Sequence, residues 1–215
     1  IDDVRLYNRA LATSEIEYLA SGNPSTGSGV YTLGSSVNIS GDLSIYGGKV
    51  NTSSYDITLS GSFINAGDFS SNGTVILDGG TGTTQALSGN TVFNNLSKQT
   101  TSANTLILEH TAKQSVSGAL TLQGAASNVI SLRSSKTGSA ANLLLDATSG
   151  SQSLSELAVK DIDASSGKLL TCIGCTNSSN NTNWNFGGNV TGKVNSTSSN
   201  GILAGKTVSI STNGG

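Results

Sequence analysis

Short apolar runs recur along most of the chain, and small polar residues separate them. Within a run, apolar residues often alternate with Ser, Thr or Asn, as in Val37-Asn38-Ile39 and Leu120-Thr121-Leu122. A period of two places successive side chains on opposite faces of a β-strand. Further runs lie at 74–77, 105–108, 129–132 and 142–145. Most runs are too short for helices and are flanked by turn-forming residues, so the pattern predicts many short strands.

An internal repeat of the form apolar-Ser-Gly-x-apolar accompanies these runs. Its copies are Ile39-Ser40-Gly41-Asp42-Leu43, Leu59-Ser60-Gly61-Ser62-Phe63, Val116-Ser117-Gly118-Ala119-Leu120 and, more loosely, Leu87-Ser88-Gly89-Asn90-Thr91-Val92. In chain order the glycines follow one another after 20, 28 and 29 positions. These spacings fall in the range of repeat lengths that indicates solenoid proteins.

We therefore predict an all-β fold whose central part is a right-handed parallel β-helix, a solenoid over residues 30–187. Stacked turns bury a thin core and pair their backbones without needing many apolar residues. At about 20–25 residues a turn this region makes about seven turns, and at ~4.8 Å between strands a rod of roughly 35 Å. The alternative is an antiparallel β-sandwich, for which Asn72-Gly73 and Asp78-Gly79 are the main candidate hairpin turns.

The two ends of the chain differ from this central region. Residues 1–21 contain an apolar-polar strand pattern around Val4 and a capping box, Ser14 with Glu17, that opens a short helix. Residues 22–29 are rich in Gly and Ser and are expected to be a linker. Residues 188–215 begin a new pattern, which we predict to be an incomplete β-sandwich. The absence of Met, even at position 1, leads us to expect a segment of a longer chain.

Composition narrows the possible functions. The chain is 35% hydrophobic and only 11% charged, with a net charge of −2 and one Pro. Low net charge and scarce Pro argue against intrinsic disorder. No basic cluster is present to neutralise phosphates, so we expect no nucleic-acid partner. No apolar run approaches the ~18 residues of a membrane helix, so we expect no membrane insertion in this segment.

Cys172-Ile173-Gly174-Cys175 is the one conspicuous motif. A thioredoxin-like site requires a strand that leads into a helix, whereas strand-like and loop-like sequence surrounds this motif. Haem attachment requires His at position 176, which is Thr. Structural zinc requires four ligands, and the chain has two Cys and one His. We expect either a local disulfide between Cys172 and Cys175 or two free thiols, and we predict no metal or cofactor.

The remaining chemically active residues are sparse. His110 follows an apolar run, has no second His to act with, and is expected at a strand end. Asp161 and Asp163 are two positions apart, so on one strand their carboxylates would share a face and could flank a sugar or hold Ca²⁺. We favour surface residues for this pair. Asp42, Asp56, Asp68, Asp78 and Asp146 are scattered among the turns, and we assign no catalytic residue.

Trp184 and Phe186 admit two interpretations. They could form an aromatic pair that stacks on a sugar, or they could cover the open end of the solenoid, whose terminal turn needs its apolar core capped. We favour the cap. Several Asn-x-Ser/Thr sequences also occur, and the abundance of Ser and Thr accounts for them by chance.

Three segments resemble known families. Ile1-Asp2-Asp3-Val4-Arg5-Leu6-Tyr7-Asn8-Arg9-Ala10-Leu11, followed by Ser14-Glu15-Ile16, resembles the closing strand and helix of a laminin-G-like, concanavalin-type domain. The Ser-Gly copies, with the runs 67–75 and 91–96, resemble the β-helical repeats of bacterial adhesins and autotransporters. Val190-Thr191-Gly192-Lys193-Val194 and the run 203–210 are similar to the start of a carboxypeptidase-regulatory, immunoglobulin-like repeat. Together these resemblances imply a large modular bacterial surface protein.

The sequence thus leads to an expected function rather than a named ligand. We expect a non-enzymatic structural and adhesive segment of a secreted bacterial surface protein or extracellular fibre. Its partner would be a glycan or another copy of the chain, and its location extracellular, at the cell surface. The enzyme alternative is a β-helical polysaccharide lyase or hydrolase, which a cluster of acids and bases on one exposed face would support. A third hypothesis, an ice-binding surface, requires a regular array of Thr, and the Thr residues of this sequence are too irregularly spaced for one.

Overall fold

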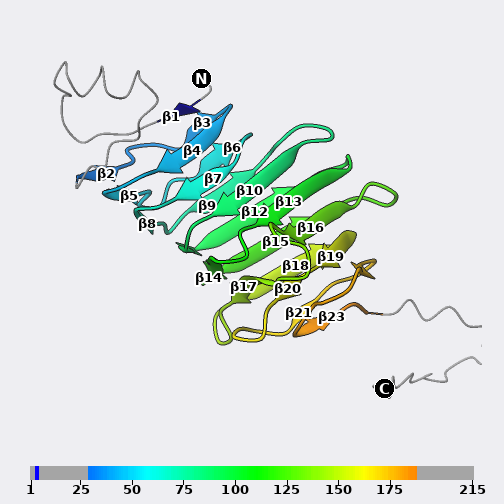
Figure 1. The fold of residues 1–215 in the computed structure, drawn as a ribbon. Coiled ribbons are helices and arrows are strands. Elements are labelled where there is room, and N and C mark those ends of the chain that lie inside the picture. The colour runs from blue at the N-terminus through cyan, green and yellow to red at the C-terminus, as the bar shows by residue number, and fades with distance from the viewer. Residues whose placement is uncertain (1–2, 5–28, 188–215) are drawn as a thin grey trace, which may run out of the picture.

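The computed structural model describes residues 3–4 and 29–187, and the strands within them stack in parallel (Figure 1). Every hydrogen-bonded pair of named strands runs parallel. This excludes the antiparallel sandwich for the central region and agrees with a parallel β-solenoid. The predicted helix near Ser14, the predicted linker up to residue 28 and the predicted C-terminal sandwich lie outside the described residues.

The strands form three sides, and in each turn the chain visits them in the order side 3, side 2, side 1. Side 1 is one eight-stranded sheet. Its strands are β1 (Asp3–Val4), β4 (Asp42–Ile45), β7 (Phe63–Asn65), β10 (Thr84–Ser88), β13 (Asn104–Leu108), β16 (Ile130–Ser134), β19 (Leu157–Lys160) and β22 (Thr176–Asn177). β1 thus adds a strand to side 1 beside β4.

Side 2 is a six-stranded sheet that two further strands extend. The six are β3 (Val37–Ile39), β6 (Ile57–Leu59), β9 (Thr74–Leu77), β12 (Asn95–Gln99), β15 (Ala119–Gln123) and β18 (Ser151–Ser155). The pair β21 (Leu170–Thr171) and β23 (Trp184–Asn185) follows, with β21 in contact with β18.

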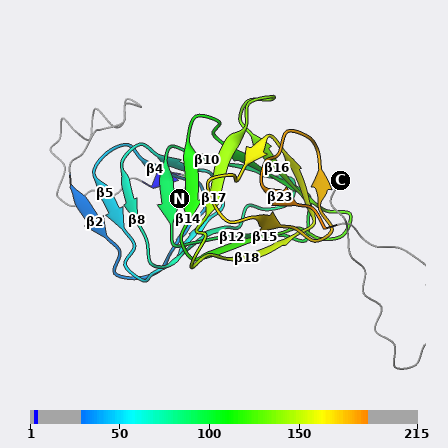
Figure 2. The ribbon, with the colours of Figure 1, turned by 90° about the horizontal axis from the view of Figure 1, so that it is seen from below.

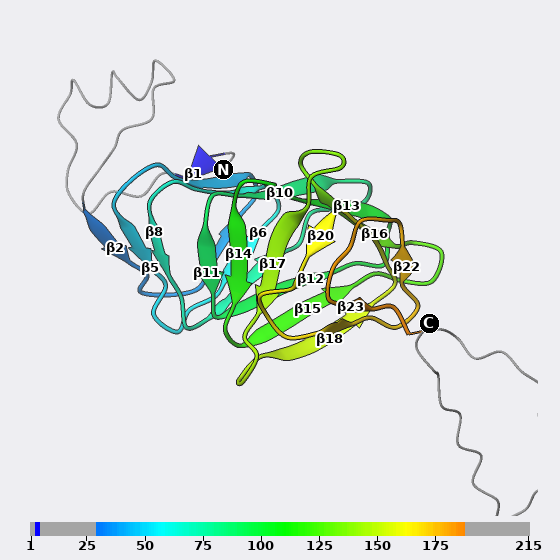
Figure 3. The ribbon, with the colours of Figure 1, turned by 60° about the horizontal axis from the view of Figure 1, so that its bottom comes forward.

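Side 3 consists of a three-stranded and a four-stranded sheet, which meet where β8 contacts β11. The strands are β2 (Val30–Thr32), β5 (Lys49–Asn51), β8 (Asp68–Ser70), β11 (Thr91–Phe93), β14 (Lys113–Val116), β17 (Ala141–Leu145) and β20 (Ile162–Asp163). Figure 2 and Figure 3 show this side with its strands next to one another in chain order.

Seven turns, each with one strand from every side, lie between β2 and β22 in the described residues, which is the number that the length predicts. Their lengths vary widely. The register pairs Leu59 with Leu77, 18 positions later, and Leu120 with Gln152, 32 positions later. The strands keep their register while the corner loops absorb the difference, since a loop can lengthen at little thermodynamic cost.

The Ser-Gly repeat marks corners rather than turns of constant length. The first two copies occupy the corner from side 2 to side 1, where Gly61 N donates to Gly41 O at 3.0 Å. The copy at Gly89 follows β10 at the corner from side 1 to side 3, and the copy at Gly118 lies between β14 and β15. Only the first spacing, of 20, is therefore the length of a turn. The spacings of 28 and 29 are longer than one turn, because each joins two copies that lie at different corners.

The core is a narrow column of inward side chains from all three sides. Leucine dominates it, and Phe63, Phe69 and Phe93 form an edge-to-face cluster with ring centroids 5.0 to 5.9 Å apart. Phe63 and Phe93 are fully buried. Because each strand contributes only two or three inward residues, this column is completed with few apolar residues. The low hydrophobic content of the chain follows from that geometry.

Candidate functional site: the uncharged face of side 2

The outward face of the six-stranded sheet carries uncharged side chains, most of which have hydroxyl or amide groups. Alternate residues of each strand point outward, and the register aligns them in rows across the sheet. The middle row consists of Asn38, Thr58, Ile76, Ser97, Thr121 and Ser153. Lys98 is the one charged residue in these six strands, and its side chain is buried in the core. The face therefore offers hydroxyl and amide groups without charge.

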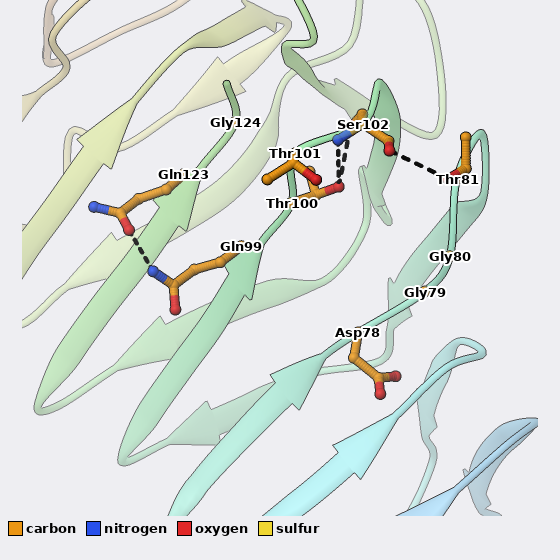
Figure 4. A pocket seen from close by; sticks show the side chains of 10 residues that line it. All are labelled: Asp78, Gly79, Gly80, Thr81, Gln99, Thr100, Thr101, Ser102, Gln123 and Gly124. Carbon is orange, nitrogen blue, oxygen red and sulfur yellow. Dashed lines mark hydrogen bonds between the residues drawn. The ribbon is translucent and has the colours of Figure 1, made fainter. Parts of the chain in front are cut away.

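Two hollows follow the edge of this face, where the chain crosses to side 1. The first has a volume of about 180 Å³, and its polar lining consists of Asn38, Ser40, Thr58, Ser60 and Asp78. The second has a volume of about 530 Å³ and is lined by Asp78, Thr81, Gln99, Thr101, Ser102 and Gln123, among others (Figure 4). Because Asp78 lines both hollows, we treat them as one feature and call it the trough.

Hydrogen bonds along the trough hold its side chains in place. Gln99 Nε2 donates to Gln123 Oε1 (Figure 4), and Gln123 Nε2 donates to Ser153 Oγ at 2.8 Å. Nearer the first hollow, Ser60 Oγ donates to Asp78 Oδ1 at 2.9 Å. Each of these bonds joins neighbouring turns. The stacking that builds the fold therefore also orients the polar groups of the trough.

A buried amine lies on the core side of the trough. Lys98 Nζ donates to Gln85 Oε1 at 2.5 Å, and Gly79 N, at the trough wall, donates to the same oxygen at 3.2 Å. Burial lowers the pKa of Lys98 to about 8, against the opposing effect of the Asp78 carboxylate. Our sequence analysis missed this lysine, although position 98 is in phase with the buried Leu96.

The cysteine motif lies in the last described turn. Cys172 and Cys175 are joined by a disulfide, with Cα atoms 5.7 Å apart. Cys172 is buried, and the Sγ of Cys175 accepts a hydrogen bond from Leu157 N at 3.1 Å. The disulfide closes the corner before β22, and the hydrogen bond from Leu157 N joins this corner to the start of β19 in the preceding turn.

The structure does not place Asp161 and Asp163 on one strand face. We favoured surface positions for both, but Asp161 is buried and Asp163 is half-buried. Asp161 occupies the bend between β19 and β20 with a φ of 58°, and only Asp163 belongs to a strand. The two carboxylates have separate structural contacts. Asp161 Oδ1 accepts from Asn180 Nδ2 at 2.7 Å, whereas Asp163 Oδ1 accepts from Ser165 N at 2.8 Å.

Several other acidic side chains also bind backbone amides at corners. Asp42 Oδ1 accepts from Ser62 N at 2.5 Å and Asp56 Oδ1 from Thr74 N at 2.7 Å, one turn later in each case. Asp146 accepts hydrogen bonds from backbone amides of the loop that follows it, and the bond from Ser149 N is the main cause that lowers the pKa of Asp146. These carboxylates therefore connect neighbouring turns of the solenoid or close a loop, and they do not gather around a common point.

His110 and the two aromatic residues lie where the sequence suggests. His110 follows the end of β13, and its Nδ1 lies 3.1 Å from Ser135 Oγ. Trp184 and Phe186 stack with ring centroids 5.6 Å apart and pack against the core at its C-terminal end. This packing agrees with the predicted cap. Among the described residues, the buried Trp184 Nε1 has no hydrogen-bond partner.

Neither a cluster of metal-ligating side chains nor a helix that could cross a membrane is present in residues 3–4 and 29–187. No three His, Cys, Asp or Glu side chains there are grouped to hold a metal ion. Nor does that part of the chain contain a helix long and apolar enough to cross a membrane.

No family model, curated protein or solved structure matches this chain. The laminin-G-like and immunoglobulin-like assignments of the two ends therefore stay predictions.

We expect Asp161→Asn to lower the stability of the folded chain near neutral pH. The hydrogen bond from Asn180, followed by that from Gly138 N at 3.1 Å, lowers the pKa of Asp161. A carboxyl whose pKa is lower in the folded state stabilises the fold above its unfolded pKa of about 4, and this contribution disappears as the pH falls through the folded pKa. Asparagine tolerates the positive φ but gives Gly138 N no second acceptor oxygen.

Urea unfolding at neutral and at acid pH measures this effect. The stability difference between the original chain and Asp161→Asn should shrink at acid pH. Asp163→Asn is the matched control, because its oxygen still accepts from Ser165 N. An equal loss in both variants at both pH values would contradict the assigned role.

Proposed function

We propose that this chain is a non-enzymatic structural and adhesive segment of a bacterial extracellular surface protein, in which a stiff solenoid presents side 2 for attachment. The observation that carries the proposal is the combination of an in-register parallel stack with one sheet face that has no outward charge. The finer assignments belong to the same proposal: a right-handed coil, a laminin-G-like end before it and an immunoglobulin-like repeat after it.

The stack supports a scaffold role through the direction of its bonds. Backbone hydrogen bonds between parallel strands point along the axis from turn to turn on all three sides. Side chains such as Asp42 and Asp56 add bonds in the same direction. Extending or bending the rod would break many of these bonds together, which favours stiffness.

The alternative, a polysaccharide lyase or hydrolase, requires catalytic carboxylates that face one substrate. In the described turns Asp42, Asp56, Asp146 and Asp161 each accept hydrogen bonds from backbone amides. A release of reducing ends or unsaturated products from polysaccharides by the purified chain would favour the enzyme instead.

Display on a non-adherent bacterial strain tests the adhesive role. We expect cells that display the chain to be retained under flow on polysaccharide-coated surfaces several times better than cells that display an unrelated domain. The control is the Gly89→Ala chain, which we expect not to fold for the steric reason given in the Discussion. Equal retention with the folded chain and this control would contradict the proposal.

A further inference from the structure

We propose that the trough binds a neutral polysaccharide chain that lies along the axis of the stack. This inference rests on the proposed adhesive function and names its ligand class and its site. It concerns the edge of side 2 between β3 and β15, where the two hollows meet at Asp78.

The first argument is the chemistry of the lining. Gln99 and Gln123 carry amides, each with donor and acceptor atoms, and Thr81, Thr101 and Ser102 carry hydroxyls. Sugar hydroxyls also both donate and accept hydrogen bonds, so these side chains can bind a carbohydrate as donors and as acceptors. The bond from Gln99 to Gln123 (Figure 4) and the bond from Gln123 to Ser153 hold the two amides before any ligand arrives. Such preorganisation lowers the entropic cost of binding.

The second argument is charge. Asp78 is the one charged residue that lines either hollow. The nearby lysine, Lys98, is buried and donates to Gln85 inside the core, so it does not face the trough. An acidic polysaccharide or a nucleic acid would meet a carboxylate and no exposed cation, which is unfavourable. A protein partner would usually need a central apolar or aromatic anchor, and the trough has only one apolar side chain among its described lining residues, Ile39 in the first hollow. A neutral, hydroxyl-rich ligand fits best.

The third argument is shape. The trough crosses the edges of five neighbouring strands of side 2, from β3 through β6, β9 and β12 to β15. At about 4.8 Å between strands this path is roughly 19 Å long. That length exceeds a single sugar ring and follows the axis of the rod. The geometry therefore suits an extended chain whose successive sugars meet successive turns.

Affinity electrophoresis of the 215-residue chain in gels that contain a soluble polysaccharide tests the proposal. The probes are hydroxyethyl cellulose, galactomannan, laminarin and dextran as neutral chains, with alginate and heparin as anionic ones. The test variant is the double substitution Gln99→Ala/Gln123→Ala. The matched control is Thr84→Ala/Thr105→Ala, which removes another pair of polar side chains facing each other on adjacent strands, on side 1.

We expect at least one neutral polysaccharide to retard the chain. The trough variant should bind it about tenfold more weakly, because two hydrogen-bonding side chains are lost, while the control variant should bind as the original chain does. Circular dichroism should show both variants folded. Should the trough variant fail to fold, Gly80→Glu replaces it, since a Cβ at Gly80 meets no atom within 4 Å and Gly80 lines the second hollow.

Three results would overturn the inference: no retardation by any neutral probe, retardation by the anionic probes alone, or equal weakening in the trough and control variants. Self-association that the trough variant abolishes would assign the trough to a second copy instead. If displaying cells are still retained under flow without trough binding, the adhesive function stands and only the trough is excluded. If neither assay gives a signal, both proposals fail.

Discussion

Lys98→Met should make the folded chain more stable at neutral pH, by about 2 kcal/mol. Lys98 stands in an inward row of leucines, next to Leu122 in the register, and it is completely buried. Burial lowers its pKa to about 8 from 10.5, which corresponds to a cost of about 3 kcal/mol for the charged form. Methionine is of similar length and removes this cost. The lost hydrogen bond to Gln85 offsets about 1 kcal/mol of the gain.

The stability difference between Lys98→Met and the original chain should depend on pH, because the pKa of Lys98 is lower in the folded chain. Between about pH 8 and 10.5 the unfolded chain binds the Lys98 proton and the folded chain does not, so the original chain gains stability as the pH rises. Lys98→Met lacks this gain, and its advantage should therefore shrink by about 3 kcal/mol across that interval. Urea unfolding at the two ends of the interval measures it. Lys113→Met, at an exposed position on side 3, is the control. A variant less stable than the original at neutral pH would refute the assigned cost.

Gly89→Ala is expected to prevent stable folding, with a loss of about 4 kcal/mol or more out of a typical total of about 5–15. Gly89 lies at the corner between β10 and β11 with a φ of 76°. A Cβ there would overlap the backbone oxygen of Asn65 in the preceding turn. The corner would have to move, and that movement would disturb the bond from Gly89 N to Glu109 Oε2 in the following turn.

Gly82→Ala separates the steric effect from the conformational one. Gly82 has a φ of 71°, close to that of Gly89, but a Cβ there meets nothing within 4 Å. Its cost should therefore be about 1–2 kcal/mol, from the left-handed backbone alone. Thermal or urea unfolding of both variants measures the difference. Similar losses at the two glycines would show that contact between turns at Gly89 is unimportant.

Some features of the candidate site could be predicted from the sequence, and others could not. Alternation in Leu96-Ser97-Lys98-Gln99 tells which side chains point inward, so the sequence alone could have predicted a buried Lys98 beside an outward Gln99. The contact of Gln99 with Gln123 could not be predicted, because it joins residues 24 positions apart through the stacking of two turns. The separation of Asp161 from Asp163 was hidden for a related reason, since Asp161 itself forms the corner before β20, to which Asp163 belongs.

The sequence by itself determined the short strands, the turn-forming corners and the thin core, because alternation and Gly placement act over a few residues. It also set the number of turns, since strand length and corner length add up along the chain. Only the tertiary structure decided which corner each Ser-Gly copy occupies and which polar residues meet in the trough. Turns of 18 to 32 residues bring distant positions into register, and loop length alone does not reveal that register. The hydrogen bonds between stacked strands and the filling of the shared core select it.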